Sequence, residues 1–160
     1  MKTISYVKGD ATQPQGEGNK IIAHVCNDIG RWGKGFVLSL SKCSPKPEQA
    51  FHQWFAERQN NDFGLGAVQF VQIELDVWVA NMIGQHKIKV KGDRGVPPVR
   101  YEAIGQALAK VGEKAVELQA SVHMPRIGCG LAGGKWEFIE PLVIQHLSKR
   151  GVQVIIYDWD

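Results

Sequence analysis

The sequence predicts a three-layer α/β/α sandwich with a central mixed sheet of about six strands. Six short apolar runs have the length and composition of strands, and segments with helical spacing of apolar residues lie between them. Strands that alternate with helices are typical of a sheet covered by helices on both faces. We therefore expect a single domain over residues 1–160, in which 44% hydrophobic residues suffice for a substantial core.

The expected strands differ in their burial. Lys20–Cys26 is almost continuously apolar, which is typical of a strand buried on both faces, whereas Ala67–Ile73 alternates. The tight segment Glu74–Asp76 predicts a hairpin, which makes the sheet mixed rather than purely parallel. The six expected strands are Ile4–Val7, Lys20–Cys26, Ala67–Ile73, Val77–Ile83, Ser121–Met124 and Val152–Tyr157.

The expected helices occupy the segments between these strands. Arg100–Leu118 is the clearest, with apolar residues on one face and charged residues opposite. Gly33–Lys42 precedes it, together with a helix that Ser44 caps and whose first turn contains two prolines. The last expected helix is Gly134–Lys149, and Pro141 inside it predicts a kink or a delayed start.

Composition and charge exclude several classes of protein. The formal net charge of +3 suits an anionic ligand but is too small for a dedicated nucleic-acid-binding domain. The three cysteines, Cys26, Cys43 and Cys129, are widely spaced and predict neither a disulfide framework nor a metal site. No apolar run has the length of a signal-peptide core or a membrane span. We expect a cytoplasmic protein without a membrane partner.

Two glycine-rich stretches carry the functional signal. The first glycine loop, Gly30–Gly35, and the second glycine loop, Pro125–Gly134, each follow a predicted strand and lead into a helix. In that setting backbone amides hold phosphate groups, and two such loops on neighbouring strands suit a diphosphate. The alternative is that both are ordinary tight turns. The Walker pattern is absent and no GxGxxG fingerprint follows the first strand, which disfavours P-loop enzymes and nicotinamide-dependent dehydrogenases.

Segments spread over most of the chain resemble the macro domain family. Gly9–Thr12 resembles the family's turn after the first strand, His24–Asn27 with Gly33–Phe36 its second strand and glycine-rich loop, and Val79–Gln85 its central strand. Met124–Gly134 is the most specific segment. It resembles the diphosphate-binding loop of the branch that holds the terminal ADP-ribose protein glycohydrolase and the yeast-type ADP-ribose-1''-phosphate phosphatases.

The resemblance implies the macro domain fold and ADP-ribose, or a derivative of it, as the ligand, with no cofactor. It places Asp10 at the adenine amino group, Tyr157 near the adenine ring, and Asn27 and Asp28 beside the distal ribose. Without the resemblance, Asp10 fits a turn aspartate that caps its own backbone equally well, and Tyr157 fits an ordinary edge aromatic better. The expected ligand-binding residues are Asp10, Ala11, Asn27, Gly33, Lys34, Gly35, Phe36, Ile127, Gly128, Cys129, Gly130, Leu131, Ala132 and Tyr157.

The candidate catalytic residues are His24 and Asp28. His24 matches a histidine of the phosphatase branch and suits proton transfer near neutral pH, and Asp28 is the alternative for that role. The competing interpretations are a core histidine satisfied by a backbone carbonyl and a loop aspartate that caps a helix. The glycohydrolase has an acid at the position of Ala132 and a lysine on or after the central strand. Here the acid is replaced by alanine and the strand itself has no lysine, while the lysines of the following loop do not align with the family's lysine.

Two further features have more than one interpretation. Cys129 lies in the second glycine loop, but no histidine is near it in sequence, and we expect it to pack rather than react. The segment Gln85–Arg100 is either a solvated surface loop, or a lid or docking patch for an anionic substrate such as a nucleic acid end or a modified protein. Its cations are Lys87, Lys89, Lys91, Arg94 and Arg100.

Two classes of function share the predicted ligand site. One is an enzyme that releases phosphate from ADP-ribose-1''-phosphate or ADP-ribose from a modified macromolecule, and the other is a non-catalytic ADP-ribose reader. The sequence favours the enzyme, because a reader usually needs a second domain to act on what it recognises. A nucleic-acid-binding domain is the weakest hypothesis, since the basic segment lacks interleaved aromatic residues.

Overall fold

Six strands form one mixed sheet in a computed structural model that describes residues 1–90 and 95–159. The strand order is β1-β6-β5-β2-β4-β3, and every neighbouring pair is parallel except β3 and β4. The expected fold class and the hairpin after Glu74 are confirmed. The strands are β1 Ser5–Lys8, β2 Lys20–Asn27, β3 Val68–Glu74, β4 Val77–Gln85, β5 Ser121–Met124 and β6 Val154–Asp158.

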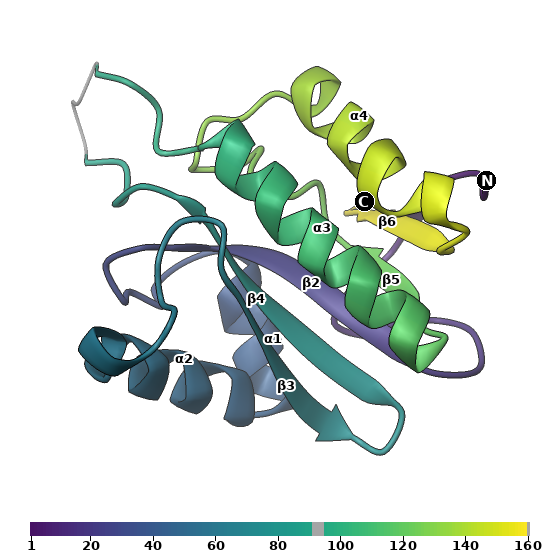
Figure 1. Ribbon diagram of the computed structural model, residues 1–160, viewed down its shortest axis with the longest axis horizontal. Coiled ribbons are helices and arrows are strands. Elements are labelled where there is room, and N and C mark those ends of the chain that lie inside the picture. The colour runs from purple at the N-terminus through teal and green to yellow at the C-terminus, as the bar shows by residue number, and fades with distance from the viewer. Residues whose placement is uncertain (91–94, 160) are drawn as a thin grey trace.

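Helices cover both faces of this sheet, as Figure 1 shows. The helices α1 and α2 lie on one face, and α3 and α4 lie on the other. None of the helices in the described residues is both long and apolar enough to cross a lipid bilayer. Their bounds are α1 Phe36–Cys43, α2 Lys46–Ala56, α3 Tyr101–Leu118 and α4 Trp136–His146, with short 3₁₀ turns at Arg58–Asn60 and Ser148–Arg150.

The helix boundaries differ from the sequence prediction at three points. Helix α1 begins at Phe36 rather than Gly33, because Gly35 has a φ of 78° and lies outside the helical region. The N-cap of α2 is Pro45 rather than Ser44, although the Ser44 hydroxyl accepts a hydrogen bond from the Lys46 amide, 3.2 Å away. Helix α4 begins at Trp136 and runs through Pro141 to His146, so the delayed start is wrong.

Strand β2 is the centre of the core. It lies between β4 and β5, and its side chains alternate between the two faces of the sheet. Ile21 packs in the cluster under α3 and α4, whereas the next residue, Ile22, packs with Leu40 of α1 on the opposite face. Both isoleucines have no exposed surface, which confirms a strand buried on both faces.

A buried polar network ties α2 to three strands. His24 of β2 and Asn81 of β4 are register partners, and the His24 Nε2 lies 2.6 Å from the Asn81 Oδ1. The Asn81 Nδ2 donates to the Pro47 carbonyl of α2 at 3.2 Å and to the Gln69 Oε1 of β3 at 3.1 Å. Gln69 in turn donates to the Ala50 carbonyl of α2 at 2.9 Å. The network satisfies polar groups that the α2 face of the core would otherwise bury without partners.

We expect Asn81→Ala to lower the free energy of unfolding by about 1–3 kcal/mol, the usual cost of leaving buried polar groups without partners. The substitution removes the acceptor of His24 and the donor to Pro47 together. Urea denaturation at neutral pH measures the effect. Asn60→Ala, at an exposed position, is the control and should stay within about 0.5 kcal/mol of the wild type. Equal midpoints for both variants would contradict a stabilising role for the network.

Candidate functional site

The candidate site lies where the carboxyl ends of five strands meet. Parallel pairing brings the ends of β1, β6, β5, β2 and β4 to one edge of the sheet. The first glycine loop follows β2 and the second follows β5, and these two strands are neighbours. The two loops therefore lie next to each other at this edge, as expected for loops that line one crevice.

The second glycine loop is folded back on itself. The Gly134 amide donates to the Gly128 carbonyl at 2.7 Å, and the Gly133 amide donates to the Gly130 carbonyl at 3.0 Å. A Cβ atom at Gly134 would lie 2.4 Å from the Gly128 oxygen, and Gly128 itself has a φ of 72°. These glycines are thus required by the packing of the loop, independently of any ligand.

Other glycines of the same loops face open space. A Cβ atom at Gly33, Gly35 or Gly130 would have no neighbour within 4 Å. Within the described residues, no acceptor is found for the backbone N–H groups of Gly130, Leu131 and Ala132, three in succession at the tip of the second loop. Consecutive unpartnered N–H groups in an accessible loop are donors that an anion can accept.

Three predicted ligand-binding side chains make hydrogen bonds within the protein. The Asp10 Oδ1 accepts from the Thr12 amide at 2.9 Å and from its hydroxyl at 2.7 Å, so Asp10 caps its own turn. The Asn27 Oδ1 accepts from the Arg31 amide at 3.0 Å and shapes the first glycine loop. Tyr157 is 3% exposed, and its hydroxyl bonds with His123. Their contacts with a ligand stay predictions.

The remaining predicted ligand-binding residues differ in exposure. Lys34 and Leu131 are exposed, and Phe36 is half-buried against His24. Ala11, Ile127 and Ala132 are buried, so only their main chain is placed to meet a ligand.

Cys129 is partly buried, and its Sγ lies 3.5 Å from the Ile127 carbonyl, while burial raises the pKa of its thiol. This environment favours packing over reactivity.

His24 is a core residue. It is 2% exposed, and the rings of Trp32 and Phe36 lie 5.4 and 5.7 Å from its own. Burial lowers the pKa of the imidazole to about 4. The alternative of a satisfied core histidine matches this geometry, except that its partner is the Asn81 amide rather than a backbone carbonyl. A catalytic role for His24 stays a prediction, and its burial argues against one.

Asp28 forms a pair that the sequence analysis missed. Its Oδ2 lies 2.7 Å from the Nδ1 of His86, and its Oδ1 accepts the Lys87 amide at 2.7 Å. The signal for this pair is the strand register: Asn27 is opposite Gln85, so the residues that follow each lie side by side. Asp28 therefore binds the loop after β4 instead of capping a helix.

The basic segment after β4 is partly structural. The Arg100 Nη1 donates to the carbonyls of Pro97, Pro98 and Val99, at 2.6, 3.1 and 2.9 Å, so this cation holds its own turn. Lys87 and Lys89 are exposed. Lys91 and Arg94 lie outside the described residues. A docking role for this segment stays a prediction.

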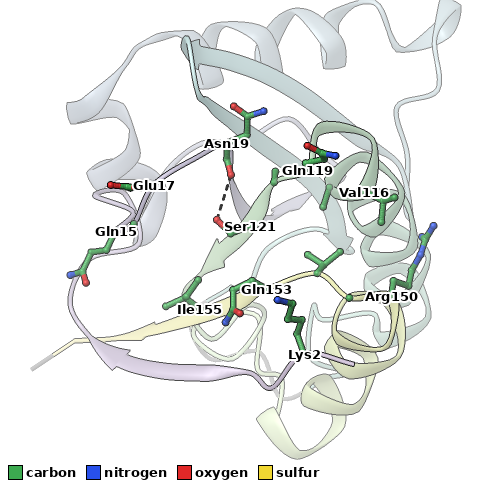
Figure 2. A pocket seen from close by; sticks show the side chains of 15 residues that line it. Lys2, Gln15, Glu17, Asn19, Val116, Gln119, Ser121, Arg150, Gln153 and Ile155 are labelled. Carbon is green, nitrogen blue, oxygen red and sulfur yellow. Dashed lines mark hydrogen bonds between the residues drawn. The ribbon is translucent and has the colours of Figure 1, made fainter.

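A hollow of about 650 Å³ lies at the opposite edge of the sheet, near the amino ends of β5 and β6 (Figure 2). Asn19, Ser121 and Gln153 are among its lining residues. The Ser121 hydroxyl donates a hydrogen bond to the Asn19 carbonyl, 3.5 Å away, which Figure 2 marks with a dashed line. None of the predicted ligand-binding residues lines this hollow. It is therefore separate from the candidate site at the carboxyl edge.

Comparison with solved structures finds whole-length relatives. A macrodomain protein from Streptomyces coelicolor is 60% identical, with a TM-score of 0.86, over 98% of this chain and 99% of that chain. A protein of unknown function from Bacteroides thetaiotaomicron is 53% identical, with a TM-score of 0.93, over 98% of both chains. No protein-family model matches the chain.

Curated proteins with similar sequences fall into two groups. Chromodomain-helicase-DNA-binding protein 1-like from Mus musculus is 32% identical over 97% of this chain, but the chain spans only 18% of that relative's length. ADP-ribose 1''-phosphate phosphatase from Meyerozyma guilliermondii is 25% identical over 97% of this chain and 100% of its own length. The similarity to the second relative therefore extends over both chains almost entirely.

We expect Gly134→Ala to destabilise the protein by about 1–3 kcal/mol, the usual cost of overpacking, because its Cβ would meet the main chain of Gly128. Gly130→Ala is the matched control in the same loop, since its Cβ enters open space, and it should stay within about 0.5 kcal/mol. Urea denaturation of both variants makes the comparison. A Gly134→Ala protein as stable as Gly130→Ala would show that the loop closure is not required.

We expect stability to fall as the pH drops from about 6.5 to about 4, because burial lowers the pKa of His24 and of His123 to about 4. In this window the unfolded chain binds more protons than the folded one, which favours unfolding by up to about 3 kcal/mol for each histidine. Urea midpoints across the window measure the slope. His123→Gln should reduce the slope, whereas the exposed control His52→Gln should not. A flat profile in the wild type would contradict the neutral buried rings.

Proposed function

The chain belongs to the macrodomain family, and we propose that it binds ADP-ribose at the carboxyl edge of its sheet and hydrolyses an ADP-ribose derivative there. The substrates proposed are ADP-ribose-1''-phosphate and ADP-ribose attached to a protein or nucleic acid. In each of them the departing group is joined to the distal ribose, while the ADP part that the loops would hold is the same.

The observation that carries the proposal is the pair of open glycine loops on neighbouring strands. The second loop offers the successive N–H groups of Gly130, Leu131 and Ala132, and the first presents Gly33 and Gly35 to open space. Hydrogen bonds from backbone amides to a diphosphate need close approach, which the missing Cβ atoms allow. Because β2 and β5 are adjacent, both loops reach one diphosphate.

Support for hydrolysis comes from the whole-length similarity to a phosphatase of ADP-ribose-1''-phosphate. Asp28 and His86 add titratable groups next to the first glycine loop. The competing function is a non-catalytic reader, and Ala132 favours it, because a glycohydrolase of the resembled branch has an acid at that position. Incubation with ADP-ribose-1''-phosphate and with ADP-ribosylated protein and DNA separates the two functions by the appearance of product.

We expect Gly130→Gln to weaken ADP-ribose binding by at least about tenfold, or about 1.4 kcal/mol. The glutamine would occupy the space in which the diphosphate approaches the loop, while its Cβ meets no protein atom within 4 Å, so the fold should survive. Titration calorimetry with ADP-ribose measures the affinity. Gly64→Gln, at another glycine with open space around it, should bind as the wild type does. Equal affinity in the two variants would place the diphosphate elsewhere.

A further inference from the structure

His86 differs from the other histidines in its surroundings. His24 and His123 are buried, His52 lies on α2, and His146 ends α4. His86 follows β4 at the carboxyl edge, and 44% of its side chain is exposed. It is therefore the histidine whose ring can meet both solvent and a ligand held at that edge.

Asp28 holds the imidazole in one orientation. The carboxylate is shielded, with 16% of its side chain exposed, and it accepts the Nδ1 hydrogen of His86 at 2.7 Å. An Nδ1 that carries the hydrogen leaves the lone pair of the neutral ring on Nε2. Among residues 1–90 and 95–159 no hydrogen-bond partner is found for that Nε2. The carboxylate is thus committed to orientation and the ring nitrogen is open.

The backbone on both sides of the pair is fixed as well. The Asp28 Oδ1 accepts the Lys87 amide at 2.7 Å, and Lys87 has a φ of 59°, which a lysine rarely adopts. The His86 amide donates to the Pro98 carbonyl at 2.8 Å. The next residue, Val99, donates its amide to the Ala132 carbonyl at 2.9 Å, so one short segment joins His86 to the second glycine loop.

We propose that the Asp28–His86 pair performs the proton transfer of hydrolysis, with His86 as the catalytic residue and Asp28 as its positioning residue. The inference rests on the proposed function. The Asp28–His86 pair would supply the acid–base chemistry that Ala132, which has no acidic side chain, cannot supply. The arrangement, a carboxylate that orients an exposed imidazole, is one that enzymes use for general base and acid catalysis.

The proposed step balances without a further reactant. The His86 Nε2 takes a proton from water while the water oxygen bonds to the anomeric carbon of the distal ribose. The bond from that carbon to the departing oxygen breaks, and its electron pair stays on the departing oxygen. The imidazolium then returns the proton to the departing group, which leaves His86 neutral again. The Asp28 carboxylate stabilises the transient imidazolium by its charge.

The charged groups around the ring bear on its pH dependence. Asp28 faces it from the loop after β2, and Lys87 is the next residue in its own chain. On the segment that packs against it, the Arg100 guanidinium is occupied by the carbonyls of Pro97, Pro98 and Val99. The carboxylate is therefore the charged group in direct contact with His86 in the described residues.

The test compares His86→Gln with His52→Gln, which removes another exposed histidine that lies near a carboxylate, Glu48, but is away from the site. Phosphate release from ADP-ribose-1''-phosphate and ADP-ribose release from modified protein and DNA are followed for both. We expect His86→Gln to lower kcat by at least about 100-fold on the substrate that the wild type hydrolyses. ADP-ribose affinity and the urea midpoint should stay those of the wild type, because the ring is exposed. His52→Gln should behave as the wild type in every assay.

Three readouts separate proton transfer from a merely structural role. The pH profile of the wild-type kcat should contain a limb that is absent in His86→Gln. Added imidazole should restore part of the activity of His86→Ala. Asp28→Asn should lower kcat more than it changes KM, because the ring loses its orientation while the ligand loops remain.

The outcomes distinguish this inference from the function on which it rests. Wild-type kcat in His86→Gln, with turnover by the wild type, overturns the assignment and leaves the hydrolase intact. Loss of ADP-ribose affinity in His86→Gln also overturns it, because the residue then serves binding. A wild type that binds ADP-ribose but hydrolyses none of the substrates overturns both the hydrolase and the pair, and leaves a reader.

Discussion

The pairing of β2 with a parallel neighbour on each side is the constraint on which the rest of this structure depends. The strand is buried on both faces and has no free edge, so its direction sets the direction of β4 and β5. Strand β6 runs parallel to β5, and β1 runs parallel to β6. The loops after all five strands consequently meet at one edge, and that edge carries every group assigned to the candidate site.

The glycines at this edge perform two physically different tasks. Gly128 and Gly134 lie against each other, so closing the loop leaves no room for a Cβ at Gly134. Gly130 and Gly33 face open space, and their small size matters only when a ligand approaches. Folding and ligand binding therefore depend on different glycines, so substitutions of these glycines can change the stability without the affinity, or the affinity without the stability.

The histidines show how burial decides chemistry. His24 lies on β2, and His86 follows the neighbouring strand β4. Each ring has an oxygen partner within 2.7 Å. Burial lowers the pKa of His24 to about 4, although the hydrogen bond with the Asn81 amide acts in the opposite direction. The partner of His86 is a carboxylate, and the ring is exposed to solvent. The same side chain is structural in one position and suited to proton transfer in the other.

The sequence by itself determined the fold class, the hairpin, the central burial of Lys20–Cys26 and the two glycine loops. These follow from local signals, namely the period of apolar residues and the positions of glycine and proline. Only the tertiary structure decided that His24 is buried and that Asp28 contacts His86. The register between β2 and β4 shifts after Cys26, which places Asn27 opposite Gln85 and the following residues in contact. Contacts between residues far apart in the chain depend on the order of the strands and on irregularities such as this register shift, and the period of apolar residues in one strand predicts neither.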